Sequence, residues 1–126
     1  MLKACLFSVF FLFESVLSQT LKELPQPSGL QAKFNEKEIN LSWEIRGKAD
    51  SLSFNVYRSV VFDPENIHFD LLSFKKVKNT TDEFYKEIFR DTKNIGHLAF
   101  IYFVTALDST GLESVRSNYF FVNLKE

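Results

Sequence analysis

The sequence predicts an all-β protein, a β-sandwich of seven antiparallel strands with Greek-key topology. Apolar and polar residues alternate in several short stretches, and polar turns separate these stretches. No stretch shows the repeat of a strong amphipathic helix. The chain has 126 residues, of which 45% are hydrophobic and 25% charged. This length and balance are typical of one globular domain.

Seven stretches of the chain are expected to form the strands. They lie at residues 30–34, 38–45, 52–58, 74–77, 85–90, 99–107 and 119–124. The first follows a polar segment with Pro25 and Pro27, which is typical of the approach to a strand. The second has the clearest alternation, with Ile39, Leu41 and Trp43 on one face and polar residues on the other. This second strand is therefore expected to be half buried in an antiparallel sheet.

The third strand also alternates, with Phe54 and Val56 predicted to face inward. The fourth and fifth strands are shorter. Between the third and the fourth, residues 60–73 form a long connection with seven apolar residues between Val60 and Leu72. Connections of this length are usually functional or cover something. The sequence leaves both alternatives open: a cover over an apolar sheet face, or a contact loop beside an open one.

The sixth strand is rich in β-branched and aromatic residues, and a polar turn follows it. Its even-numbered side chains from Phe100 to Ala106 are predicted to face the core, which leaves the odd-numbered ones outside. In the last strand, Phe120, Val122 and Leu124 are predicted to face the core. This register determines which aromatic side chains reach the surface.

Four motifs between Pro27 and Leu124 resemble those of a fibronectin type III domain. They are a proline-led first strand at 27–32, a second strand with its Trp at 39–43, a third-strand motif at 54–59 and a run at 102–114 that is similar to bacterial members. The resemblance implies an immunoglobulin-like sandwich in which the third, sixth and seventh strands are neighbours. It also implies binding or spacing rather than catalysis. The connection at 60–73 is longer than the family's usual one.

The N-terminus has the three parts of a secretory signal peptide. Lys3 precedes an apolar run at 4–13, and small residues follow up to the expected cleavage site after Ser18. A membrane anchor would need about 20 apolar residues, and Glu14 interrupts this run. We therefore expect a signal peptide at 1–18, a leader at 19–27 and the domain at 28–126. The mature protein, without cysteine or a further membrane segment, is expected to be secreted or periplasmic, in a cell envelope.

Composition and motifs argue against several functions. The formal net charge of −1 gives no attraction to nucleic acid or to an anionic membrane. One Cys and two His cannot build a zinc site, and the acidic residues around His68 lack the spacing of a calcium loop. No cofactor or metal is therefore expected, and His97 is expected to be a surface residue of a turn. Without a nucleophile elbow, a phosphate loop or an acid–base set, an enzyme is not expected.

The outward side chains of the third, sixth and seventh strands are expected to form one apolar patch. The predicted contact residues are Tyr57, Ile101, Phe103, Tyr119 and Phe121, together with Phe62 and Phe69 of the long connection. Such exposed patches mark interaction surfaces, and aromatic residues are enriched at interface hot spots. The protein is therefore predicted to be a non-catalytic module that binds another protein, or a second copy of itself. The alternatives are a carbohydrate-binding module that stacks aromatic rings on a glycan, and a structural subunit of a cell-envelope assembly.

Overall fold

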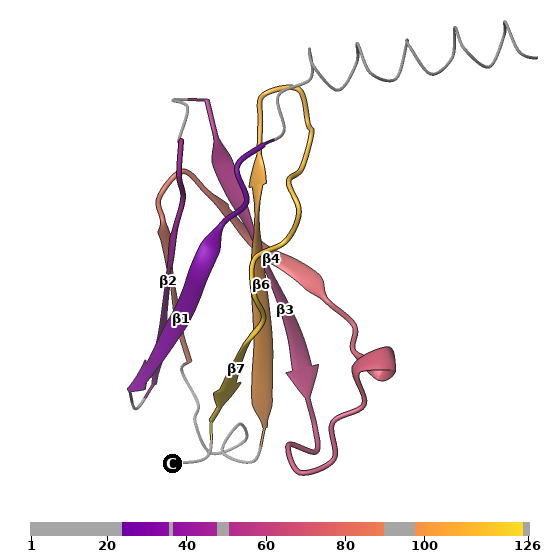
Figure 1. Cartoon of the computed structure of the whole chain (residues 1–126). Helices are drawn as coiled ribbons and strands as arrows, with labels where there is room; N and C mark the ends of the chain where they lie inside the picture. Colours follow the sequence, from indigo (N-terminus) through magenta and orange to yellow (C-terminus); the bar gives the residue numbers. More distant parts are fainter. Residues whose placement is uncertain (1–23, 36, 48–50, 90–97, 125–126) are drawn as a thin grey trace, which may run out of the picture.

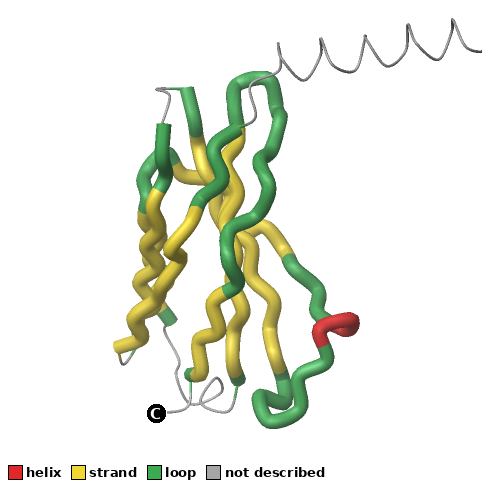
Figure 2. The backbone as a smooth tube through the Cα atoms, in the orientation of Figure 1, coloured by secondary structure: helices red, strands yellow, loops and turns green. Residues whose placement is uncertain are grey.

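Two antiparallel sheets pack face to face in the computed structural model of the protein (Figures 1 and 2). The structure describes residues 24–35, 37–47, 51–89 and 98–124. The predicted signal peptide at 1–18, the start of the leader and His97 lie outside the described residues. Within the described ranges, the chain forms seven strands and one short 3₁₀ helix. The predicted all-β fold class is therefore confirmed. No helix among these residues is long and apolar enough to cross a membrane.

The first sheet has three strands in the order β1-β2-β5. They are β1 (Ser28–Asn35), β2 (Glu38–Glu44) and β5 (Phe84–Ile88). The central strand β2 pairs antiparallel with both neighbours. Its burial follows the predicted alternation, since Ile39, Leu41 and Trp43 are buried while Asn40 is exposed. One face of this sheet therefore lines the core and the other faces solvent.

The second sheet has four strands in the order β4-β3-β6-β7. They are β4 (Lys75–Thr80), β3 (Ser53–Val61), β6 (Ala99–Leu107) and β7 (Phe120–Asn123), and the 3₁₀ helix η1 (Phe69–Leu71) lies between β3 and β4. The strands β3 and β6 pair without interruption from Ser53 opposite Leu107 to Val61 opposite Ala99. This pairing extends β3 beyond its predicted end at Arg58. As the family resemblance implies, β3, β6 and β7 are neighbours.

The core between the sheets confirms the predicted register of β6. The main apolar cluster contains every even-numbered side chain of this strand from Phe100 to Ala106. Val122 joins it from β7, and Trp43 meets Phe54 edge to face with ring centroids 5.6 Å apart. Trp43, the only Trp of the chain, is thus a core residue and presents no ring to solvent.

A second, smaller apolar cluster lies on the outer face of the four-stranded sheet. Ile101 is 2% exposed and packs there with Val61 and Ala99. Side chains of the β3–β4 connection and its end pack onto these residues. They are Ile67, Leu72 and Phe74. The expectation that Ile101 is exposed is therefore wrong, because it points away from the main core but is covered by the connection.

Candidate docking surface

Four aromatic rings meet on the outer face of the four-stranded sheet, and we call them the aromatic cluster. They belong to Tyr57 on β3, Phe74 before β4, Phe103 on β6 and Tyr119 before β7. The rings of Tyr57 and Phe103 are stacked, with centroids 4.7 Å and planes 14° apart. Phe74 meets Phe103 edge to face at 4.9 Å, and Tyr119 lies 5.7 Å from both of these rings. The contacts hold the rings as one preformed group.

Arg116 lies over this cluster. The carbon atom of its guanidinium group is 5.5 Å from the ring centroids of both Phe103 and Tyr119, and its Nη1 donates a hydrogen bond to the Tyr119 hydroxyl. Such cation–π contacts orient the planar guanidinium group. Within the described ranges, no carboxylate forms a salt bridge with Arg116. Its positive charge therefore lies at the surface beside the rings.

Glu113 holds the Tyr57 ring of the aromatic cluster in place through hydrogen bonds. Its carboxylate accepts a hydrogen bond of 2.8 Å from the Tyr57 hydroxyl and one of 2.6 Å from the Thr105 hydroxyl. The bond from Thr105 lowers the pKa of Glu113 and, with the bond from Tyr57, outweighs the opposite effect of burial. Burial, followed by the nearby Glu113 carboxylate, raises the pKa of Tyr57 above its usual value. The ring of Tyr57 is thus held through its hydroxyl as well as through its face.

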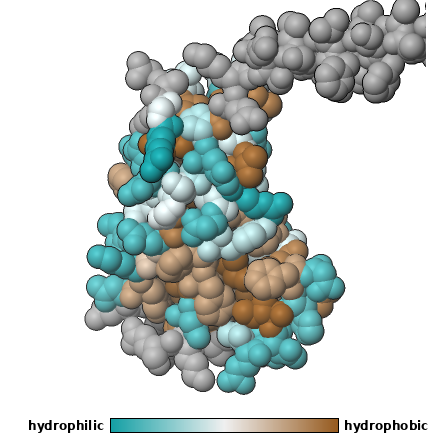
Figure 3. Space-filling model, in the orientation of Figure 1, coloured by the Kyte–Doolittle hydropathy of each residue, from teal (hydrophilic) through white to brown (hydrophobic). Residues whose placement is uncertain are grey.

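Several large apolar side chains stay exposed beside the aromatic cluster. Phe69 is 66% exposed, Tyr119 42% and Phe121 40%, and the ring centroids of Phe69 and Tyr119 are 6.4 Å apart. Phe62 and Leu71 of the β3–β4 connection are exposed as well. Figure 3 shows apolar side chains gathered in the lower half of the molecule, over β7 and this connection. We call these five side chains the open patch.

The predicted contact residues fall into three groups. Tyr57 and Phe103 are half-buried in the aromatic cluster, and Ile101 lies beneath the β3–β4 connection. The remaining four are exposed, namely Phe62, Phe69, Tyr119 and Phe121. The connection at 60–73 combines the two alternatives of the sequence analysis. Its inner side covers Ile101, and its outer side contributes exposed residues to the open patch.

The sequence alone does not predict the places of Phe74, Glu113 and Arg116. Phe74 is predicted as the first residue of the fourth strand, but it precedes β4, and the predicted strand is too short to orient its ring. Glu113 and Arg116 are charged residues of an irregular segment, and such residues are usually solvated. In the described part of the chain, no three His, Cys, Asp or Glu side chains come together as metal ligands. The exposed His68 stands at the start of η1.

Similarity to known proteins agrees with this architecture, although no protein-family model matches the chain. A curated relative, amylopullulanase from Thermoanaerobacter thermohydrosulfuricus, is 36% identical over 95 residues. The match covers 75% of this chain but only 6% of that enzyme. This chain is therefore similar to a small segment of a much larger protein.

Two solved structures have the same fold. An Fn3-like protein from Clostridium thermocellum superposes with a TM-score of 0.52 at 21% identity, over 75% of this chain and 86% of that one. The sixth fibronectin type III domain of human fibronectin type III domain containing protein 3 superposes with a TM-score of 0.56 at 12% identity, over 86% and 93%. The class is thus an immunoglobulin-like β-sandwich. Within this class, the chain has the fold of a fibronectin type III domain.

Proposed function

We propose that the protein is an exported, non-catalytic module that docks another protein through its open patch. The observation that carries the proposal is the pairing of exposed apolar side chains with a preformed support. Phe69 and Tyr119 are exposed, yet Tyr119 already contacts Phe74 and Phe103 of the aromatic cluster. Rings that are ordered before binding lose little conformational entropy when a partner covers them.

Arg116 adds oriented hydrogen-bond donors and a positive charge to this surface. The guanidinium group is already oriented by Phe103 and Tyr119, and it retains donors for an additional acceptor. An acidic group at the rim of a partner would meet these donors beside the apolar patch. Apolar anchors with Arg at the margin are the usual composition of a protein interface.

Substitutions in the open patch test the docking proposal. We expect Phe69→Asp and Phe121→Asp to abolish capture of cell-envelope proteins by the immobilised protein, because each places a charge among the apolar contacts. Ile88→Asp on β5 is the matched control, since Ile88 is equally apolar and 65% exposed on the other sheet. Capture that survives both patch substitutions, or that Ile88→Asp removes equally well, would contradict the proposal. Gel filtration of the purified protein shows whether the partner is a second copy.

Export is part of the proposal and rests on the N-terminal sequence pattern at 1–18. Cleavage after Ser18 would leave Gln19 as the first residue of the mature protein. N-terminal sequencing of the protein from the culture medium or periplasm measures this directly. A protein that is retained in the cytoplasm with Met1 or Leu2 at its start would refute it.

Carbohydrate binding is the second candidate, and the similarity to a segment of amylopullulanase favours it. The aromatic cluster is a poor site for it, because Tyr57 and Phe103 already cover each other's faces. A sugar ring that stacks needs a free aromatic face. The opposite sheet offers a different arrangement.

A further inference from the structure

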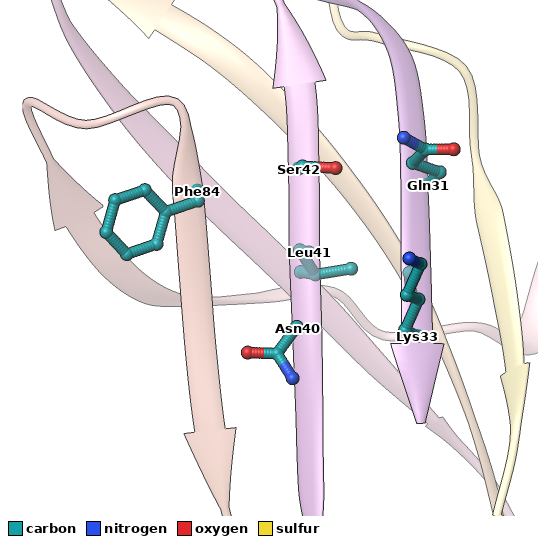
Figure 4. Close-up of a pocket in the computed structure, with 7 residues that line it drawn as sticks. Gln31, Lys33, Asn40, Leu41, Ser42 and Phe84 are labelled. Carbon is teal, nitrogen blue, oxygen red and sulfur yellow. The ribbon is translucent and has the colours of Figure 1, made fainter. Parts of the chain in front are cut away.

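The outer face of the three-stranded sheet carries a hollow of about 340 Å³ over β2. This volume is within the range of about 300–1,000 Å³ that is typical of ligand sites. Figure 4 shows its lining side chains on three neighbouring strands. They are Gln31 and Lys33 on β1, Asn40 and Ser42 on β2, and Phe84 on β5. Ala32 and Leu41 complete the lining.

Strand pairing brings these side chains together. Gln31 is opposite Ser42, and Lys33 is opposite Asn40 across the β1–β2 pair. On the other side of β2, Ser42 is opposite Phe84. Short side chains on the central strand thus lie between Gln31 and Lys33 on one flanking strand and Phe84 on the other, and the ring of Phe84 points away from β2 (Figure 4). The result is a trough that follows the strand direction, with outward residues about 6–7 Å apart along each strand.

The hydrogen-bonding capacity of the trough is largely unused. Neither Gln31, Lys33 nor Ser42 has a side-chain hydrogen bond or ion pair with another residue of the described ranges. Phe84 is 59% exposed at the margin of the trough. Polar side chains on the outer face of an antiparallel sheet are hydrated in the free protein. Their donors and acceptors, and the exposed ring of Phe84, are therefore available to a ligand.

We propose that this trough binds a neutral polysaccharide chain. A pyranose ring has an apolar face of C–H groups that fits an exposed phenyl ring, and a rim of hydroxyl groups that both donate and accept hydrogen bonds. Amide and hydroxyl side chains such as Gln31, Asn40 and Ser42 also both donate and accept, so they match this rim. No carboxylate lines the trough, and Lys33 is the only charged group in its lining. The neighbouring Lys86 is paired with Glu38 at 2.8 Å.

Other ligand classes fit this trough less well. A nucleic acid needs several cations along its phosphates, and the lining supplies only Lys33. A peptide that adds as a strand would use a sheet edge, whereas the trough lies on the face above the central strand β2. The trough is on the opposite sheet from the open patch. Failure of glycan binding would therefore not affect the protein-docking proposal, and failure of docking would not affect glycan binding.

Native affinity electrophoresis tests the proposal with gels that contain soluble glucans. The neutral probes are amylopectin, pullulan and a mixed-linkage β-glucan, and polygalacturonate is the anionic probe. We expect at least one neutral glucan to retard the protein. Phe84→Ala should weaken this binding by about tenfold or more, the equivalent of one good ring contact. Ile88→Ala on the same strand, where the side chain is 65% exposed and outside the lining of the trough, is the matched control and should leave binding unchanged within about twofold.

Several results would overturn the proposal. They are no retardation by any neutral glucan, retardation by polygalacturonate alone, and equal retardation of the wild type and Phe84→Ala. Gln31→Ala is the second variant should Phe84→Ala fail to fold, since Gln31 is exposed and its amide lines the trough. Amide shifts in an NMR titration should centre on residues 31, 33, 40, 42 and 84. Shifts that centre on Tyr119 and Phe121 instead would contradict this site.

Discussion

Three polar side chains link the two sheets through the interior. Arg58 of β3 forms an ion pair with Glu87 of β5, and the Tyr102 hydroxyl of β6 donates a hydrogen bond of 2.9 Å to the same carboxylate. Arg58 also lies over the ring of Phe100, with its guanidinium carbon 4.7 Å from the centroid. A buried charge is tolerated when it has partners of this kind. The loss of one partner leaves the others partly unsatisfied.

Tyr102 makes the stability of the fold sensitive to alkaline pH. Burial, followed by the Glu87 carboxylate, raises the pKa of Tyr102 far above its usual value of 10.0. The folded protein therefore keeps this proton at a pH where the unfolded chain releases it. The contribution of Tyr102 to the free energy of unfolding should therefore be constant below about pH 10. Above this pH, the contribution should fall as the pH rises.

Urea denaturation between pH 8 and pH 11 measures this effect. We expect Tyr102→Phe to be less stable at neutral pH but to lose stability more slowly above about pH 10 than the wild type. Part of the slope remains in the variant, because burial also raises the pKa of Tyr57 and Tyr85. Parallel slopes for the two proteins would show that Tyr102 has no part in the pH dependence.

At the scale of elements, part of β6 has side-chain hydrogen bonds in place of backbone pairing with a neighbouring strand. Beyond its pairing with β7, the N–H groups of Val104 and Ala106 donate to the hydroxyls of Ser117 and Ser114. In return, the N–H group of Ser117 donates to the carbonyl group of Val104, and that of Ser114 donates to the carbonyl group of Ala106. Asn118 bonds both backbone groups of Leu30 on β1 in a similar way. These bonds fix the irregular segment that places Glu113 and Arg116 at the aromatic cluster.

Ser117→Ala tests the replacement of strand pairing by side chains. Ser117 is buried, so its loss leaves the N–H of Val104 without a partner away from water. We expect the free energy of unfolding to fall by about 1–3 kcal/mol. Ser109→Ala, at an exposed turn position, should change it by less than about 0.5 kcal/mol. Equal effects of the two substitutions in urea denaturation would contradict the proposed role of Ser117.

The elements that the sequence predicts well are those whose burial has a simple period. β2 is the clearest case, since its buried and outward side chains alternate. In β6 the even-numbered side chains line the main core as predicted, but Ala99, Ile101 and Thr105 are buried as well. The connection at 60–73 has no period, so neither η1 nor the cover over Ile101 follows from alternation. The trough is a similar case. The alternation of β2 predicts Asn40 and Ser42 outside, but only strand pairing brings Phe84 beside them.

At the scale of the whole molecule, the two outer faces differ in chemistry. The face of the four-stranded sheet is apolar, partly closed by the β3–β4 connection and partly open at Tyr119 and Phe121. The face of the three-stranded sheet has mostly polar side chains around the trough, with the exposed Phe84 and Ile88 on β5. The proposed protein-docking surface and the proposed glycan site therefore lie on opposite faces of the sandwich. This division depends on the connection, which separates buried from exposed residues on the apolar face.

The most direct test compares two apolar truncations on this face by urea denaturation. Ile101 is buried beneath the connection, whereas Phe121 is 40% exposed beside it. We expect Ile101→Ala to lower the free energy of unfolding by about 2–5 kcal/mol and Phe121→Ala to lower it by less than about 1 kcal/mol. Similar losses for both, or a larger loss for Phe121→Ala, would contradict the division of this face into a covered and an open half.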